Sequence, residues 1–241
     1  MEFVIVGTSA AVAGIVQNIA GFGAGIILMM ILPHFYGVLG APALNTGICM
    51  VMTTLLAIRY RKYLSFRTIV IPLACFLLTT VTSIWLVGSA DLHLLGIAFG
   101  IFFIVLALYF MFVQKNLKVS GNPIVGAVCG LISGALSGLF SIGAPTMALY
   151  FRAVTEDRNH YFASLQTLLA VANTVSTITR INRGLYPADL ILPSVVGFLG
   201  LLAGQFIGSK VGKNLDAEKL NQFIYIMVLL SGINTLVKYI R

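Results

Sequence analysis

The stretch that decides the fold is residues 3–34, FVIVGTSAAVAGIVQNIAGFGAGIILMMILPH, which contains no Asp, Glu, Lys or Arg. The charge-free sequence continues beyond it, so that 56 residues separate Glu2 from Arg59. A helix needs roughly 20 apolar residues to span a bilayer. The stretch is therefore too long for one ordinary crossing, and Gly21-Phe22-Gly23-Ala24-Gly25 interrupts it.

A second long segment, residues 123–151, has the same character. It is broken by Gly138-Leu139-Phe140-Ser141-Ile142-Gly143-Ala144-Pro145. Glycine costs about 1 kcal/mol inside a helix, and proline removes a backbone donor. We therefore expect each segment to form two shorter helices joined by irregular backbone, the second helix starting near Ile26 and near Thr146. Such backbone is tolerated at membrane depth only where protein or a water-filled cavity surrounds it.

The rest of the chain is equally apolar. Of its 241 residues 59% are hydrophobic and 9% are charged, whereas soluble domains carry about 25% charged residues. The apolar runs do not alternate as the strands of a membrane barrel do. We predict an all-α, polytopic helical membrane protein that forms one membrane domain over residues 1–241. The remaining apolar segments are 41–58, 68–87, 92–113, 161–179, 189–209 and 220–237.

The formal net charge of +8 fits this class of protein. Lys and Arg in short loops are topology signals of membrane proteins. We therefore expect the chain to be embedded in a lipid bilayer and not to bind nucleic acid. We expect a multi-pass protein of the cell inner (plasma) membrane. Cys49, Cys75 and Cys129 all lie inside apolar runs without metal-like spacing, which indicates packing residues.

The chain divides into two halves that look like repeats, approximately 3–113 and 123–239. A shift of 121 residues or slightly less brings similar residues together, and two related halves are common in transporters. At a shift of 121, Asn45-Thr46 meets Gln166-Thr167, Thr53 meets Thr174, Arg59 meets Arg180, Leu64 meets Leu185 and Pro72 meets Pro193; at a slightly smaller shift Gly14 meets Gly130, Gly21 meets Gly138 and Gly25 meets Gly143.

The distribution of charge allows two topologies. If each broken segment crosses the membrane once, there are eight crossings, and one side collects ten Lys and Arg against five. If each segment is a re-entrant hairpin, each half keeps three transmembrane helices, the halves are inverted, and the counts are eleven against four. The richer side is cytoplasmic in both cases. We favour the inverted version, which places the C-terminus on the opposite side.

The polar residues at depth are neutral. Asp and Glu are absent from the middle of every span, which disfavours cation sites and proton relays. We expect no enzyme activity, cofactor or metal site, because the sequence holds no Ser-His-Asp set, metal cluster or phosphate-loop signature. The neutral residues are Gln17, Asn18, Asn45, Thr46, Ser133, Ser137, Ser141, Gln166, Thr167, Asn173, Thr174 and Gln205.

The two breaks suggest an anion site. The first turn of a helix has free backbone N–H groups and the positive end of the helix dipole, and glycine lets a ligand approach the backbone. We expect the helix starts that follow the two breaks to hold an oxyanion without a buried Lys or Arg. Pairing between helices is the other interpretation of the polar residues. The candidate substrate-binding residues are Gly21, Gly23, Gly25, Asn45, Thr46, Gly138, Ser141, Gly143, Gln166 and Thr167.

Two arginines are candidates for guiding anions to the mouths of a pathway. Arg59 and Arg180 close the helices that we expect to begin near Asn45 and Gln166. In the inverted topology one of them lies on each face. An interfacial arginine whose charge extends to the headgroups is the alternative interpretation.

The pattern as a whole resembles the sulfite exporter TauE/SafE family of membrane transporters. The resemblance rests on Gly21-Phe22-Gly23-Ala24-Gly25-Ile26-Ile27, on its partner Gly138 to Pro145, on Asn45-Thr46 and Gln166-Thr167, and on the two-half layout. Ala24 interrupts the glycine run of the family, and Met29-Met30 stand where a proline is common. The resemblance implies transport of small sulfur anions across the inner membrane, often outward.

We therefore predict an exporter or facilitator of a small anion, such as sulfite, thiosulfate or sulfoacetate. A transporter of a different small solute is the first alternative. The second is a non-transporting membrane subunit that docks a partner, for which the sequence offers no long loop or tail.

Overall fold

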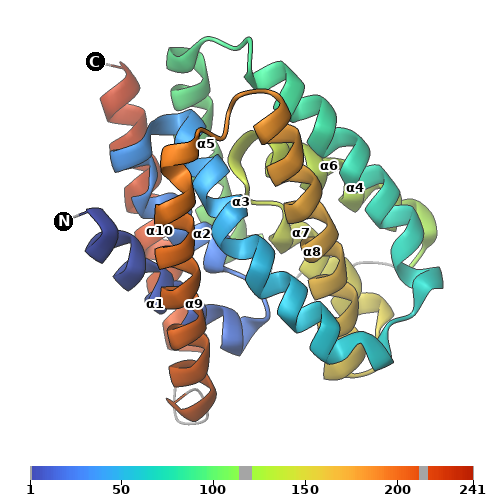
Figure 1. Cartoon of the computed structure of the whole chain (residues 1–241). Coiled ribbons are helices and arrows are strands. Elements are labelled where there is room, and N and C mark those ends of the chain that lie inside the picture. The colour runs from blue at the N-terminus through green and yellow to red at the C-terminus, as the bar shows by residue number, and fades with distance from the viewer. Residues whose placement is uncertain (1, 114–120, 212–216, 241) are drawn as a thin grey trace.

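The structure is a computed structural model that describes residues 2–113, 121–211 and 217–240. These described residues form helices and no strand, so the all-α prediction is confirmed (Figure 1). Three short elements accompany the long helices: η1 (Arg61–Tyr63), η2 (Tyr109–Val113) and η3 (Ala188–Leu190). The α-helices are α1 (Glu2–Ala20), α2 (Ala24–Ile31), α3 (Pro33–Tyr60), α4 (Phe66–Val87), α5 (Leu92–Leu108), α6 (Pro123–Phe140), α7 (Ala144–Val154), α8 (Arg158–Asn182), α9 (Ile191–Val211) and α10 (Ala217–Ile240).

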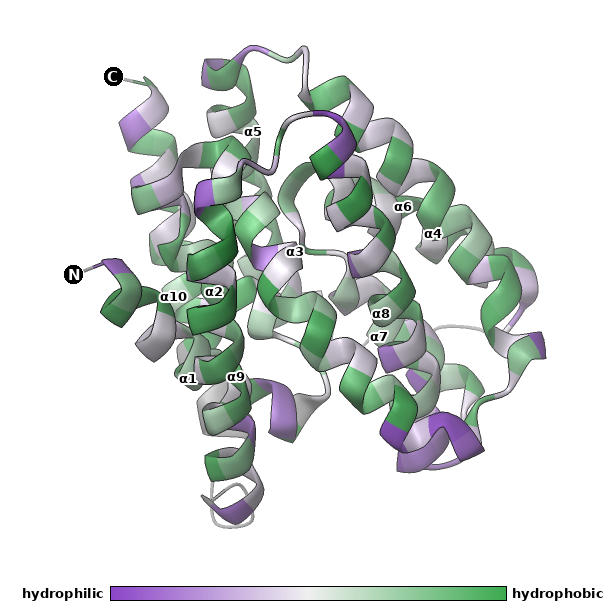
Figure 2. Ribbon diagram, in the orientation of Figure 1, coloured by the Kyte–Doolittle hydropathy of each residue, from purple (hydrophilic) through white to green (hydrophobic). Residues whose placement is uncertain are grey.

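The helices have the character of membrane spans. Among the described residues, six helices are long and apolar enough to cross a bilayer, namely α1, α3, α4, α5, α6 and α9. Large apolar side chains cover the outside of the molecule, such as Phe66, Leu86 and Phe206, which are each more than 60% exposed. Figure 2 shows that apolar residues dominate these outer faces and that hydrophilic ones gather near the helix ends. Such a surface is stable in lipid and not in water, so the polytopic class is confirmed.

Both predicted breaks are present. Residues 21–23 separate α1 from α2, and residues 141–143 separate α6 from α7. The helices that follow start at Ala24 and Ala144, two residues before the predicted starts.

The third helix of each half begins earlier than we expected. Pro33 occupies the first turn of α3, where its missing N–H costs nothing. The helix is interrupted at Gly37, whose φ of 68° is not helical, and Asn45 lies on the part that follows Gly37. Asp157 is the N-cap of α8, since its carboxylate accepts hydrogen bonds from the backbone and ring nitrogens of His160, and these bonds lower the pKa of Asp157. Asn45 and Gln166 therefore lie inside helices, and the prediction that helices begin near them is wrong.

Close glycine contacts show which helices pack together and in which direction. Helix α1 lies along α9, where Gly204 meets the backbone of Ala11. Helix α4 lies along α6, where Gly134 meets the backbone of Phe76. Both pairs run parallel, because successive glycines along one helix meet successive residues along the other. The pairs α3 with α8 and α5 with α10 form the remaining large interfaces.

Each broken segment enters and leaves at one end of the molecule. Gly121, just before α6, packs beside Val154 at the end of α7. Helix α2 packs back against α1 in the same way that α7 packs against α6. The two segments are therefore hairpins, as the re-entrant topology predicts, and the placement of these hairpins in a bilayer stays a prediction.

The two hairpins start from opposite ends. The α1–α2 hairpin starts at the end that holds Glu2, Asp91 and Asp189, which we call the acidic end. The α6–α7 hairpin starts at the end that holds Arg61, Lys62, Arg67 and Arg158, which we call the basic end. Tyr63 and His160 stack edge to face there, 5.6 Å apart between ring centroids.

Candidate functional site

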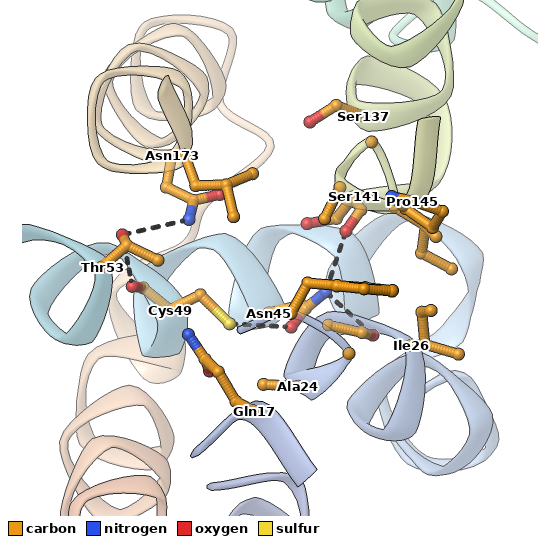
Figure 3. Close-up of a pocket in the computed structure, with 17 residues that line it drawn as sticks. Gln17, Ala24, Ile26, Asn45, Cys49, Thr53, Ser137, Ser141, Pro145 and Asn173 are labelled. Carbon is orange, nitrogen blue, oxygen red and sulfur yellow. Dashed lines mark hydrogen bonds between the residues drawn. The ribbon is translucent and has the colours of Figure 1, made fainter. Parts of the chain in front are cut away.

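The two breaks meet at a pocket in the centre of the helices. Four helices contribute polar side chains, and both helix starts α2 and α7 reach it (Figure 3). The residues that line it are Gln17, Phe22, Gly23, Ala24, Gly25, Ile26, Asn45, Cys49, Thr53, Ser137, Ser141, Ile142, Gly143, Ala144, Pro145, Leu169 and Asn173.

The pocket is small and carries no ionisable acid or base other than the Cys49 thiol. Its cavity volume, counted as the space open to the centre of a water molecule, is about 40 Å³. A single water needs roughly 10–15 Å³ by this measure. The pocket therefore suits a ligand of a few heavy atoms. Its polar surface comes from amides, hydroxyls and backbone.

Asn45 ties the two breaks together. Its Nδ2 donates to the carbonyl oxygen of Gly25 at 3.3 Å and to that of Ser141 at 3.2 Å, and its Oδ1 accepts from the thiol of Cys49 at 3.5 Å (Figure 3). The residue is buried. Both amide hydrogens are thus used on the backbone, so Asn45 positions the site more than it offers donors to a ligand.

Gln166 makes the corresponding contact from the other half of the chain. Its Nε2 donates to the carbonyl oxygen of Gly21 at 2.6 Å. Gly21 and Ser141 are the first residues of the two breaks. Each amide therefore holds the break of the opposite half, which locks α3 and α8 to the hairpins.

The backbone at the breaks turns sharply. Gly21 has a φ of 82° and Ser141 a φ of 57°, which is the left-handed region that non-glycine residues rarely adopt. A side chain at Gly143 is excluded for another reason, because its Cβ would lie 2.4 Å from the carbonyl oxygen of Ser133. These turns aim the first turns of α2 and α7 at the pocket.

Most of the lining residues form pairs at a constant spacing along the chain. Fourteen of the seventeen lining residues form seven pairs that lie 120 positions apart. This register differs from the predicted shift of 121 and from the smaller shift for the glycines. The pairs are Gln17 with Ser137, Phe22 with Ile142, Gly23 with Gly143, Ala24 with Ala144, Gly25 with Pro145, Cys49 with Leu169 and Thr53 with Asn173.

The predicted site residues are only partly brought together. Those that line the pocket are Gly23, Gly25, Asn45, Ser141 and Gly143. Gly21 and Gln166 support it through their hydrogen bond. Outside the lining are Thr46, whose hydroxyl bonds the carbonyl of Ala43 in its own helix, together with Gly138 and Thr167.

The two arginines differ from each other. Arg59 is exposed near the basic end, as expected. Arg180 is completely buried, so the expectation of an interfacial side chain at a mouth is wrong for it. The expectation of an interior without Lys or Arg fails for the same reason.

Sequence reasoning missed four polar residues of the pocket as site residues. Gln17 and Ser137 each lie one helical turn before the first residue of a break, and Thr53 and Asn173 are hydrogen bonded across the pocket at 3.4 Å. The signal was available, because a polar residue one turn before a break projects toward the same side as the break.

An apolar exterior around a polar central pocket, reached by two hairpins from opposite ends, defines a helical membrane transporter. The family model of the sulfite exporter TauE/SafE proteins matches residues 6–235. The chain belongs to this family, and it is a multi-pass membrane transporter. No curated protein and no solved structure matches the chain.

Proposed function

We propose that the chain transports a small sulfur oxyanion or organosulfonate, such as sulfite, thiosulfate or sulfoacetate, and binds it in the pocket between the two breaks. It acts as an exporter or facilitator in the inner membrane. One observation carries the proposal: two helix starts, those of α2 and α7, border one pocket whose lining contains no carboxylate.

Helix starts suit an anion for electrostatic reasons. Each carries roughly half a positive charge and up to four N–H groups without intrahelical partners. Pro145 lacks an N–H, so α7 offers one donor fewer in its first turn than α2 does. Hydroxyls of Ser137 and Ser141 border the same space and supply donors for oxyanion oxygens, whereas the Thr53 hydroxyl already donates to the carbonyl of Cys49 at 2.8 Å.

The neutral lining also favours release. A lysine or arginine in direct contact with a desolvated anion forms a strong charge-assisted bond. Partial charges and hydroxyls hold the anion more weakly, so it leaves the pocket more easily. The small volume favours sulfite-sized groups over extended organic acids.

The hairpins provide the moving parts. Because each hairpin starts from its own end of the molecule, a shift of one hairpin opens the pocket toward that end. The bonds from Asn45 to Ser141 and from Gln166 to Gly21 hold both hairpins in the closed arrangement. Alternating access then requires these two bonds to break in turn.

The test compares charged and uncharged molecules of one shape. Purified protein is heated with sulfite or methanesulfonate, and with dimethyl sulfone as the uncharged analogue. We expect the two anions to raise the Tm and dimethyl sulfone to leave it unchanged. Uptake of radiolabelled sulfite into proteoliposomes then measures transport. Stabilisation by neutral solutes or by cations, with no effect of sulfur oxyanions, would contradict the proposal.

A further inference from the structure

Arg180 is the largest wholly buried side chain of the described chain. Its Nη2 donates to the carbonyl oxygen of Gly138 at 2.7 Å. Its Nε and Nη1 are buried and have no partner. No described Asp or Glu forms a salt bridge with it. A guanidinium with two unpaired nitrogens is therefore enclosed by the fold.

The bond to Gly138 explains only part of this arrangement. Gly138 lies in the last turn of α6, where carbonyl groups lack helical partners and the dipole is negative, so Arg180 stabilises that helix end. One nitrogen is enough for this role. A buried charge without a full set of partners costs several kcal/mol, so selection for stability alone gives no reason to keep the other two unpaired.

The position of Arg180 links it to the pocket. Asn173 lines the pocket, and Arg180 follows it by seven residues on the same face of α8, a rise of about 10 Å toward the acidic end. Ser176 and Thr177 lie between them, and their hydroxyl oxygens are also buried without partners. The unpaired polar atoms of Ser176, Thr177 and Arg180 therefore follow one another along α8 from the pocket toward the acidic end.

The other half of the chain has no such cation. The positions 120 and 121 residues before Arg180 are Tyr60 and Arg59. Tyr60 is partly exposed and stacks on Phe162, while Arg59 is exposed. The two sides of the pocket therefore differ, and among the described residues only the side toward the acidic end holds a buried Lys or Arg.

We propose that Arg180, with Ser176 and Thr177, forms a second binding position for the transported anion, between the pocket and the acidic end. The proposal rests on the proposed function. Arg180 does not line the pocket, so the anion reaches it when the end of α6 moves. An oxyanion oxygen then takes a place among the free nitrogens, and the charge speeds passage along this route.

The test separates this role from that of a helix cap. The variants are Arg180→Gln and Arg180→Lys, with Arg183→Gln as the matched control, because Arg183 is exposed and its guanidinium lies over Trp85. Each is measured for Tm, for the Tm shift with sulfite, and for the initial rate of sulfite transport. We expect R180Q to keep the wild-type Tm or exceed it, to keep the sulfite-induced shift, and to transport at least tenfold more slowly. R180K should recover part of the rate, and R183Q should match the wild type.

Two results would overturn the inference. One is a folded R180Q that transports at the wild-type rate. The other is a lower Tm in R180Q with a proportional loss of active protein, which would make Arg180 a cap alone. If R180Q does not insert, the double variant Ser176→Ala/Thr177→Val leaves the cap intact; a threefold or greater loss of rate supports the position, and an unchanged rate refutes it. Failure of the proposed function is distinct, since wild-type protein would then show neither stabilisation by sulfite nor transport of it.

Discussion

Gln166 holds the carbonyl oxygen of Gly21 at 2.6 Å across 145 positions of the chain. Asn45 makes the matching bond to Ser141. These bonds join α3 and α8 to the turns of the two hairpins. Two amide side chains therefore fix the shape of the pocket. Their N–H groups bond to the backbone and need not contact the substrate.

Gln166→Leu should lower both stability and transport. The substitution leaves the Gly21 carbonyl buried without a donor, which costs about 1–3 kcal/mol, and it frees the turn that shapes the pocket. Asn45→Ala should act in the same direction on the other break. The measurements are Tm and sulfite uptake by inserted protein, with Thr179→Ala as the control, because the Thr179 hydroxyl bonds only to Val175 of its own helix. Normal transport by both variants would refute the role of these amides.

Asn173→Asp should weaken anion binding more than it weakens the fold. A carboxylate in the pocket repels an oxyanion, and the substitution gives up only the long 3.4 Å bond that the Asn173 amide donates to the Thr53 hydroxyl oxygen. We expect the sulfite-induced Tm shift to disappear and transport to fall at least tenfold. Thr174→Ala is the matched control, since Thr174 bonds to Ala170 within α8. A gain in cation binding without loss of sulfite binding would argue against an anion pocket.

The two termini should lie on the side of the membrane opposite to residues 61–67. Glu2 lies at the acidic end, and α10 runs antiparallel to α5, as the contacts of Gly96 with Tyr239 and of Gly232 with Ile104 show. The positive-inside rule makes the basic end cytoplasmic. A fluorescent or enzymatic reporter fused after residue 241 should therefore read as extracytoplasmic, and a cytoplasmic reading would reverse this orientation.

Gly204→Ala should disrupt the contact between α1 and α9. An added Cβ would lie 1.8 Å from the carbonyl oxygen of Ala11, and only backbone movement can relieve such a clash. Overpacking of this kind costs about 1–3 kcal/mol or more, so we expect a lower Tm and less inserted protein. Gly7→Ala is the matched control in the same interface, because its Cβ would meet Val196 at an ordinary 3.5 Å. Equal stability of the two variants would contradict the described packing.

The class of protein and the two breaks could be predicted from the sequence because both depend on local composition. Long runs without charged residues indicate membrane helices, and glycines inside such runs indicate where a helix breaks. It did not allow the interior positions of Asn45 and Gln166 to be predicted, since α3 already begins at Pro33, at the end of the preceding apolar segment, and α8 begins directly after its N-cap Asp157. Arg180 was misplaced for a related reason. It ends an apolar run as interfacial arginines do, and only the folded structure, in which its guanidinium reaches the Gly138 carbonyl of α6, reveals that it is covered. Whether the halves are related stays a prediction, which the paired lining residues support.

The spacing of 120 positions between paired lining residues has a consequence for energetics. A solute held between Gly23 and Gly143 meets the same residue type from each of the two breaks. The intrinsic affinities measured from the two faces of the membrane should then be close to each other. Net flux of an anion would follow its electrochemical gradient, and any further preference for one direction would have to originate outside the pocket.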